Sequence, residues 1–157
     1  MTDMPKTIAL DANLLVLLVV GLTERNYISV HKRLKAYSVA DFELLSALIS
    51  ASAVVAVTPN SLSEASNLLR QINEAAKRQI AIKFRELIKR TDEIYVTSAD
   101  ASSRTEFLRI GLSDSALLEV SKKNIVVLSV DLDLCAAALA AGYEAINFNH
   151  VRESFDR

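Results

Sequence analysis

Thr7-Ile8-Ala9-Leu10-Asp11-Ala12-Asn13 is the stretch that decides the fold, because a short apolar run here ends on a carboxylate, with an amide two residues later. A continuous apolar run is typical of a parallel strand that is buried on both faces. The apolar run from Leu14 to Val20 follows at once and indicates a helix. Asp11 therefore lies where a strand ends and a helix begins, and open α/β sheets bind their ligands outside the carboxyl ends of the strands.

The composition indicates one folded domain that is rich in helix. Hydrophobic residues make up 51% of the 157 residues and charged residues 24%, which argues against disorder and allows a substantial core. Only 3 glycines and 2 prolines are present, too few for an all-β fold with many tight turns. We expect a single domain over residues 1–157. The formal net charge is −1, so any attraction to nucleic acid must come from local patches.

The single cysteine and the absence of a long apolar segment indicate a soluble, cytoplasmic protein. Cys135 lies in the apolar run 132–141, so we expect a core thiol, and one cysteine excludes an internal disulfide. Asp11 and Asn13 interrupt the apolar stretch 8–22, which has no clear signal-peptide cleavage site. No window reaches the roughly 20 apolar residues of a membrane helix, so we expect no membrane partner.

Predicted strands and helices alternate along the chain. The strands are expected at 7–11, 53–57, 94–97, 125–130 and 143–148. The helices are expected at 12–21 (ended by Gly21), 26–37, 40–51, 59–69 (after Thr58), 73–90, 98–109 (ended by Gly111), 114–123 (ended by Asn124) and 132–141 (ended by Gly142), with a frayed tail from Asn149. This alternation predicts an α/β fold, with a central parallel sheet of about five strands and helices on both faces.

Acidic residues follow several of these strands. Asp11 and Asp131 end the first and fourth strands, Glu64 is about two turns into the helix after the second, and Asp114 opens the helix before the fourth. Right-handed crossovers bring the strand ends to one edge. Mg²⁺ and Mn²⁺ take oxygen ligands, and carboxylates this close cannot all be ionised without a cation. The pattern therefore predicts a divalent-metal site, with Asp133 nearby.

Other kinds of site are not indicated. His31 and His150 lie outside these motifs, so a zinc site is not expected. The sequence contains no Ser-His-Asp set, P-loop or GxGxxG motif.

Each acid taken singly also has a plainer interpretation. Asp at the start of a helix is a common N-cap, which alone could explain Asp114 and Asp131, and Glu64 could be a solvated surface residue. Asp11 is different, because it interrupts an apolar stretch and its burial requires a partner or a metal. Independent caps have no reason to converge on one edge, and this favours a shared site.

In these motifs the chain resembles the PIN domain family. The resemblance covers nearly the whole chain and rests on four motifs in order: IALDAN (Asp11, Asn13), VTPNSLSEASNLL (Glu64), GLSDSALLE (Asp114) and IVVLSVDLDLCAAALAAGYEAINF (Ser129, Asp131). It implies a Rossmann-like, three-layer α/β/α sandwich. It also implies a Mg²⁺- or Mn²⁺-dependent endoribonuclease, a class in which the toxins of bacterial and archaeal toxin–antitoxin pairs are the largest group.

The resemblance also implies roles for single residues. Asp11, Glu64, Asp114 and Asp131 would be the catalytic metal ligands, and Asp133 a fifth ligand or an acid just outside the ligand set. Asn13 and Ser129 would be hydrogen-bonding neighbours; many family members have Thr where Ser129 stands. In the implied reaction a metal-activated water attacks a backbone phosphate in line, leaving 5′-phosphate and 3′-hydroxyl ends.

RNA and protein partners are expected from the same resemblance. The basic face of helix 73–90 would hold the RNA backbone, although a solvated helix face explains its charges equally well. The RNA-binding residues would be Arg70, Lys77, Arg78, Lys83 and Arg85. A cognate antitoxin or a second copy of the chain would pack on the apolar helices 26–37 and 40–51, which core packing explains as well.

Three other functions compete with a nuclease. A haloacid-dehalogenase-type phosphatase is suggested by Val130-Asp131-Leu132-Asp133, but only 24 residues follow Asp133. A receiver domain would need a second acid beside the first strand and a lysine after a late strand, and neither is evident. The third alternative is a PIN-like scaffold that binds RNA or protein without cutting, and retention of all four acids argues against it.

Overall fold

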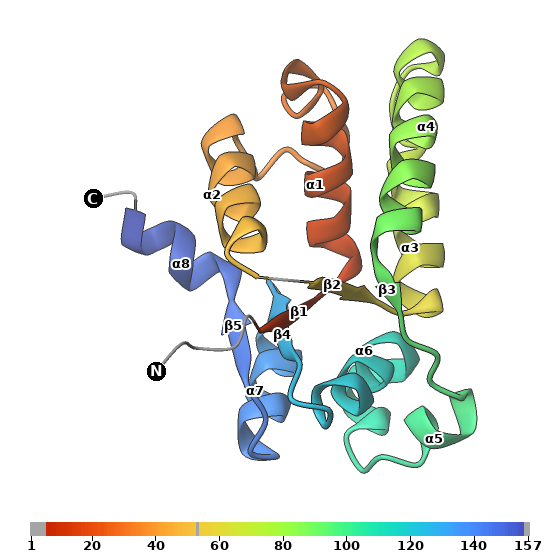
Figure 1. Ribbon diagram of the computed structural model, residues 1–157, viewed down its shortest axis with the longest axis vertical. Helices are drawn as coiled ribbons and strands as arrows, with labels where there is room; N and C mark the ends of the chain where they lie inside the picture. Colours follow the sequence, from red (N-terminus) through yellow and green to blue (C-terminus); the bar gives the residue numbers. More distant parts are fainter. Residues whose placement is uncertain (1–5, 53, 156–157) are drawn as a thin grey trace.

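The computed structural model describes residues 6–52 and 54–155, and its centre is one parallel sheet (Figure 1). Its five strands stand in the order β3-β2-β1-β4-β5, and each pairs in parallel with its neighbours. The strands are β1 (Thr7–Leu10), β2 (Val54–Val57), β3 (Asp92–Glu93), β4 (Val126–Ser129) and β5 (Ala145–Asn147). The predicted α/β class with a five-stranded parallel sheet is therefore confirmed. Residue 53, predicted as the start of the second strand, lies outside the described residues.

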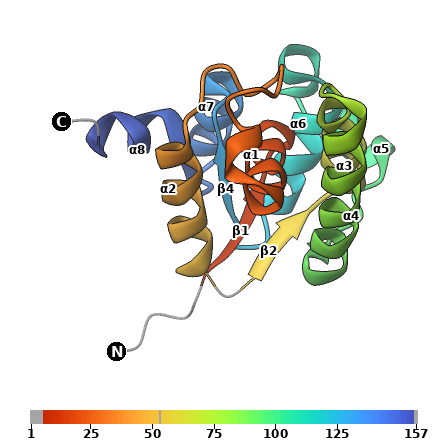
Figure 2. The ribbon, with the colours of Figure 1, turned by 90° about the horizontal axis from the view of Figure 1, so that it is seen from above.

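Helices cover both faces of the sheet. One layer contains α1 (Ala12–Thr23), α2 (Val39–Ser50), α3 (Pro59–Leu69) and α4 (Glu74–Arg90), and the other contains α5 (Ser98–Ser102), α6 (Phe107–Ser121) and α7 (Leu132–Ala140). Seen from above, α1 lies between α2 and the α3–α4 pair (Figure 2). The last helix, α8 (Phe148–Phe155), lies beside α2. Within the described residues, no helix has the length and hydropathy that crossing a bilayer requires.

The alternation of side chains along the strands divides the core into two halves. Ile8 and Leu10 belong to the buried cluster shared with α1 to α4, whereas Ala9 belongs to the cluster shared with α6 and α7. In β4, Leu128 joins the first cluster and Val127 the second. Successive residues of a strand point to opposite faces, so continuous apolar strands are what a sheet with helices on both faces requires.

Several predicted helix boundaries are confirmed together with their caps. Ser38 and Asp41 form a capping box at the start of α2. Thr58 caps α3, and Pro59 follows it in the first turn, where the missing N–H costs nothing. Asn124 has a φ of 60° at the predicted stop after α6, and Gly142 a φ of 82° after α7.

Gly21 does not end the first helix, contrary to the prediction, and α1 continues to Thr23. A Cβ atom at Gly21 would overlap the ring of Phe42 on α2. Glycine is therefore present because α2 approaches the backbone of α1 closely.

Residues 26–37 do not form the predicted helix. A single 3₁₀ turn, η1 (Arg25–Tyr27), leads into a series of turns. His31 holds them in place, because its Nδ1 accepts the Arg33 N–H at 3.1 Å and its Nε2 bonds to the Leu69 carbonyl at 3.2 Å. The apolar spacing of this segment reflects burial of Ile28 and Leu34, not helical periodicity.

The third strand was placed two residues too late, and the helix predicted at 98–109 is wrong. β3 pairs with β2 only at Asp92 and Glu93, because β2 ends at Val57. α5 stops at Ser102, and the chain is helical again from Phe107. Gly111, with φ 82° and ψ −177°, is not helical and divides α6 into two helical pieces at a kink. The predicted break at this glycine is therefore confirmed, and the helix predicted from residue 114 lies in the piece that follows it.

The predicted frayed tail is also wrong, because α8 is fixed to α2. The Arg152 guanidinium forms a salt bridge with Asp41, through Nε at 3.0 Å and Nη2 at 3.1 Å. It also donates to the carbonyl of Ala36 at 2.7 Å and lies over the Tyr37 ring, 4.7 Å from its centroid. Through these contacts Arg152 holds α8, a polar helix with little apolar surface, against α2 and the segment before it.

Candidate functional site

Asp11 is buried at the carboxyl end of β1, and protein donors satisfy its carboxylate. Oδ1 accepts the backbone N–H of Leu14 at 2.9 Å, which caps α1. Oδ2 accepts the hydroxyl of Ser129 and the N–H of Val130, the latter at 3.1 Å. Burial raises the pKa of Asp11, these hydrogen bonds oppose the rise, and the charge of Asp131 adds to it. The partner that the sequence required for a buried Asp11 is thus supplied by β4.

Ser129 connects the two acids that end β1 and β4. Its hydroxyl donates to Asp11 and accepts the N–H of Asp131 at 3.0 Å. Leu10 pairs with Leu128 in the β1–β4 register, so the next residues, Asp11 and Ser129, are cross-strand neighbours. Asp131 then caps α7, where its Oδ1 accepts the N–H of Leu134 at 3.0 Å.

Asp114 interacts electrostatically with all three of the other acids. It is half-buried in α6, just after the break at Gly111. Its pKa is raised to about 7, first by burial and then by the charges of Asp131, Asp11 and Glu64, and a hydrogen bond with Asp131 adds to the rise. Carboxylates that share a site raise one another's pKa in this way. The structure thus brings the four predicted acids to one edge of the sheet.

Glu64 is exposed, as Asp131 is, and connects α3 with α6. Its Oε2 accepts the Ser113 hydroxyl at 3.4 Å. Glu64 lies in a surface hollow with Pro59, Ser63 and Leu112, among other residues of α3 and α6. Of the four acids, Glu64 alone lines this hollow.

Two predicted site residues lie outside the group of four acids. The four acids themselves are not arranged as a ready-made ion-binding site. Asp133 and Asn13 are exposed, and neither of their side chains appears among the hydrogen bonds or ion pairs of the acids in the described residues. Across residues 6–52 and 54–155, no three or more His, Cys, Asp or Glu side chains are arranged closely enough to hold a metal ion. The oxygen donors suit a hard cation, but ligating it would require the side chains to move.

Two residues that the motifs did not single out belong to the surroundings of the site. Burial raises the pKa of the Tyr37 phenol, and the charge of Asp11 adds to the rise. Burial raises the pKa of the Cys135 thiol to about 11, with contributions from Asp11, Asp131 and Asp114. Cys135 is buried, as the sequence predicted for a core thiol. No sequence signal marked Tyr37, because it comes from the segment that was assigned to a helix.

The five predicted RNA-binding cations lie in the α3–α4 unit. Arg70 is the C-cap of α3, and Lys77, Arg78, Lys83 and Arg85 are on α4. Lys77 pairs with Glu74 at 2.8 Å and Lys83 with Glu86 at 3.0 Å, both one turn apart on the helix. Such exposed pairs contribute little to stability, so these side chains can exchange partners at low cost.

Comparisons with known proteins add little to this description. The sequence matches no family model and no curated protein. One similar solved structure is a domain of a functionally unknown protein from Methanocaldococcus jannaschii DSM 2661, with 18% sequence identity and a TM-score of 0.46. The alignment covers 90% of this chain and 90% of that one.

Proposed function

We propose that this chain is a divalent-metal-dependent endoribonuclease of the PIN-domain type, acting on RNA in the cytoplasm. The observation that carries the proposal is the contact of Ser129 with both Asp11 and Asp131. It is supported by the pKa of Asp114, which is raised to about 7 by burial first and then by the charges of Asp131, Asp11 and Glu64. These acids come from four separate segments of the sequence. Separate helix caps would not need to repel one another, whereas a cation site gathers negative charge in this way.

The donor set fits Mg²⁺ or Mn²⁺. Asp11, Glu64, Asp114 and Asp131 offer only carboxylate oxygens, which these cations prefer over nitrogen or sulfur ligands. Asp133, in the first turn of α7, would act from outside this set. When bound, such a cation lowers the pKa of a coordinated water and neutralises charge on a phosphate.

The protein's own groups would prepare the site for that chemistry. The three hydrogen bonds to Asp11 fix its orientation, and Ser129 links it to the backbone of Asp131. Asp114, with its pKa of about 7, holds a proton in part of the molecules at neutral pH. Binding of a cation would release that proton, because metal ligands must be deprotonated.

Partner proteins are a further part of the proposal. A groove between α1, α2 and α4, lined in part by Leu18, Leu22, Ile49, Val55 and Leu87, would receive an apolar segment of an antitoxin or of a second copy. Co-expression with the product of a small neighbouring gene, followed by size-exclusion chromatography, tests the antitoxin. The mass of the purified chain in solution tests the dimer.

A PIN-like scaffold that binds RNA or protein without cutting is the second candidate. It is favoured by the protein donors that already satisfy Asp11 and by the absence of a closed metal-binding group in the described residues. Unlike the nuclease, a scaffold requires no response to Mn²⁺.

RNA cleavage distinguishes the two candidates. Purified protein is incubated with a labelled, single-stranded RNA pool, with Mn²⁺ or with EDTA, and the products are separated by size. We expect Mn²⁺-dependent cleavage that Asp11→Asn and Asp114→Asn abolish. Asp100→Asn, at an exposed acid of α5, is the matched control and should cut like the wild type. Unchanged cleavage by Asp11→Asn would overturn the proposal, and RNA binding without any cleavage would support the scaffold.

A further inference from the structure

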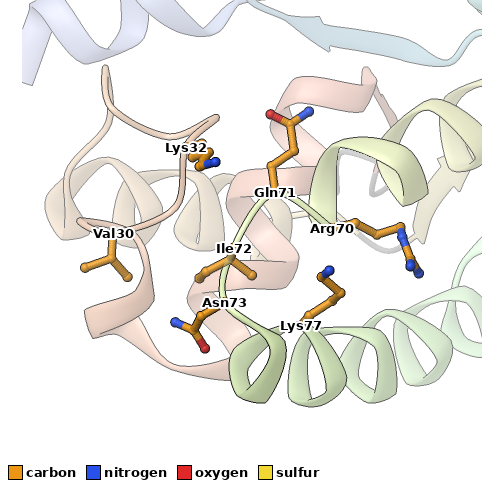
Figure 3. Close-up of a pocket in the computed structure, with 7 residues that line it drawn as sticks. All are labelled: Val30, Lys32, Arg70, Gln71, Ile72, Asn73 and Lys77. Carbon is orange, nitrogen blue, oxygen red and sulfur yellow. The ribbon is translucent and has the colours of Figure 1, made fainter.

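A pocket of about 780 Å³ lies between the turns that follow η1 and the connection from α3 to α4 (Figure 3). Lys32, Arg70 and Lys77 line it together with the apolar side chains of Val30 and Ile72. None of its lining residues is acidic. In Figure 3, the side chains of Arg70 and Lys77 lie on one side of Ile72 and that of Val30 on the other.

The two walls of the pocket are tied together. The buried His31 donates from Nε2 to the Leu69 carbonyl at 3.2 Å, since the carbonyl can only accept and Nδ1 accepts from Arg33. Next to it, the backbone N–H of Lys32 donates to the Gln71 carbonyl at 3.3 Å. The segment that carries Lys32 is therefore fixed to the segment that carries Arg70.

The positive charge in this pocket is only partly neutralised, by Glu74, whose pKa is lowered by its hydrogen bond with Lys77 and by the charges of Lys77 and Arg70. Among the ion pairs of residues 6–52 and 54–155, none includes Lys32 or Arg70. Lys77 pairs with Glu74, whose side chain is 90% exposed, so water competes strongly for that contact. The pocket also adjoins the N-terminus of α4, which Asn73 caps and which carries partial positive charge. The arrangement suits an anion.

A row of exposed polar residues on α3 leads from the acidic site to this pocket. Ser63, Asn67 and Arg70 are exposed and follow the helical spacing of one face, and Ser63 shares the surface hollow with Glu64. Arg70 is roughly 9 Å along the helix axis from Glu64, at about 1.5 Å per residue, and about a third of a turn away around the helix, at about 3.6 residues per turn. An RNA strand that passes Glu64 and then follows Ser63 and Asn67 would bring its phosphates to Arg70.

We infer that the pocket binds phosphates of the RNA strand, a few nucleotides from the bond that is cut. This inference rests on the proposed function, because it takes the acidic group as the cutting site. Arg70 and Lys77 would each contact a phosphate, and Lys32 would close the opposite wall. The same chemistry would also accept free phosphate, which is the other source of such a ligand.

The test is the salt dependence of RNA binding without cleavage. A fluorescent, single-stranded RNA oligonucleotide is titrated in EDTA and followed by anisotropy, at several salt concentrations. The double variant Arg70→Gln/Lys77→Gln should bind the RNA several-fold more weakly. The slope of the logarithm of its binding constant against the logarithm of the salt concentration should be smaller in magnitude by about 1.4, at about 0.7 for each of the two phosphate contacts. The control Lys122→Gln/Lys123→Gln removes the same charge at the end of α6, on the opposite face of the sheet, and should match the wild type.

Three results would overturn the inference. The first is an unchanged affinity and salt slope in Arg70→Gln/Lys77→Gln. The second is a wild-type protein that binds no RNA, which also removes the proposed function. The third is displacement by low-millimolar inorganic phosphate combined with an unchanged RNA slope in the variant, which assigns the pocket to free phosphate. If the wild type binds RNA through the pocket but does not cut it with Mn²⁺, the proposed function fails together with the position relative to a cut bond, and RNA binding by the pocket stands.

Discussion

Ser129 donates its hydroxyl hydrogen to Oδ2 of Asp11 across the β1–β4 pair, and both residues are buried. The same hydroxyl oxygen accepts the N–H of Asp131. One side chain thus connects the carboxylate that ends β1 to the backbone at the end of β4. Stability and site geometry depend on the same contact.

Ser129→Ala should destabilise the protein, because it removes a donor from the buried carboxylate of Asp11. The expected loss is about 1–3 kcal/mol in the free energy of unfolding, measured by urea denaturation at pH 7. Ser129→Thr keeps the hydroxyl and is the control; it should lose much less. An alanine variant as stable as the wild type would show that this hydrogen bond contributes nothing.

In the metal-free protein, the contribution of Asp114 to stability should fall as the pH rises from about 4 to about 7. Asp114 has a pKa of about 7 in the folded chain against an ordinary value near 3.8. Between these values the folded state binds more protons than the unfolded state, so deprotonation favours unfolding. The raised pKa of Asp11 acts in the same direction.

Thermal unfolding in EDTA across this pH range checks the dependence. Asp114→Asn cannot titrate and should flatten the curve, whereas Asp100→Asn should not. The buried His31, whose pKa is lowered, acts in the opposite direction in both the wild type and Asp114→Asn, so the comparison of their two curves is decisive. The same pH dependence in the wild type and in Asp114→Asn would contradict the raised pKa of Asp114.

Gly21→Ala should destabilise the protein although alanine favours helix. Its methyl group would meet the ring of Phe42, and overpacking of this kind costs about 1–3 kcal/mol. The double variant Gly21→Ala/Phe42→Ala should show a coupling in a double-mutant cycle, because removal of the ring removes the overlap. Strictly additive effects in urea denaturation would argue against the contact.

Arg152→Ala should release α8 from α2. The variant loses the salt bridge to Asp41, the bond to the Ala36 carbonyl and the stacking on Tyr37. Amide hydrogen exchange should speed up in residues 148–155 while the sheet stays protected. Lys at this position keeps the charge but not the paired geometry and should restore protection only in part. Unaltered exchange in α8 would mean that Phe148, which is buried, holds the helix alone.

The sequence predicted those parts of the fold in which local pattern and global packing agree. β1 and β4 are continuous apolar runs buried on both faces, and Thr58 with Pro59 marks the start of α3 by local chemistry alone. The expectation that the four acids lie near one another follows from these elements, because parallel strands bring their carboxyl ends to one edge of the sheet.

The errors occur where contacts between distant residues decide the structure. Gly21 resembles a helix stop in sequence, but the ring of Phe42 explains it. The tail looks too polar to fold, but Asp41 and Tyr37 give Arg152 its partners. The turns of residues 28–37 depend on the bond between His31 and Leu69. No local pattern contains this information.

Calorimetric titration with Mn²⁺ tests the central claim, that the acids at this edge share one divalent cation. At pH 7 the wild type should bind Mn²⁺ and release protons, seen as a dependence of the heat on the ionisation enthalpy of the buffer. Asp114→Asn should bind far more weakly and lose that dependence, whereas Asp100→Asn should behave like the wild type. Equal Mn²⁺ binding by Asp114→Asn and the wild type, or no binding by either, would contradict the account.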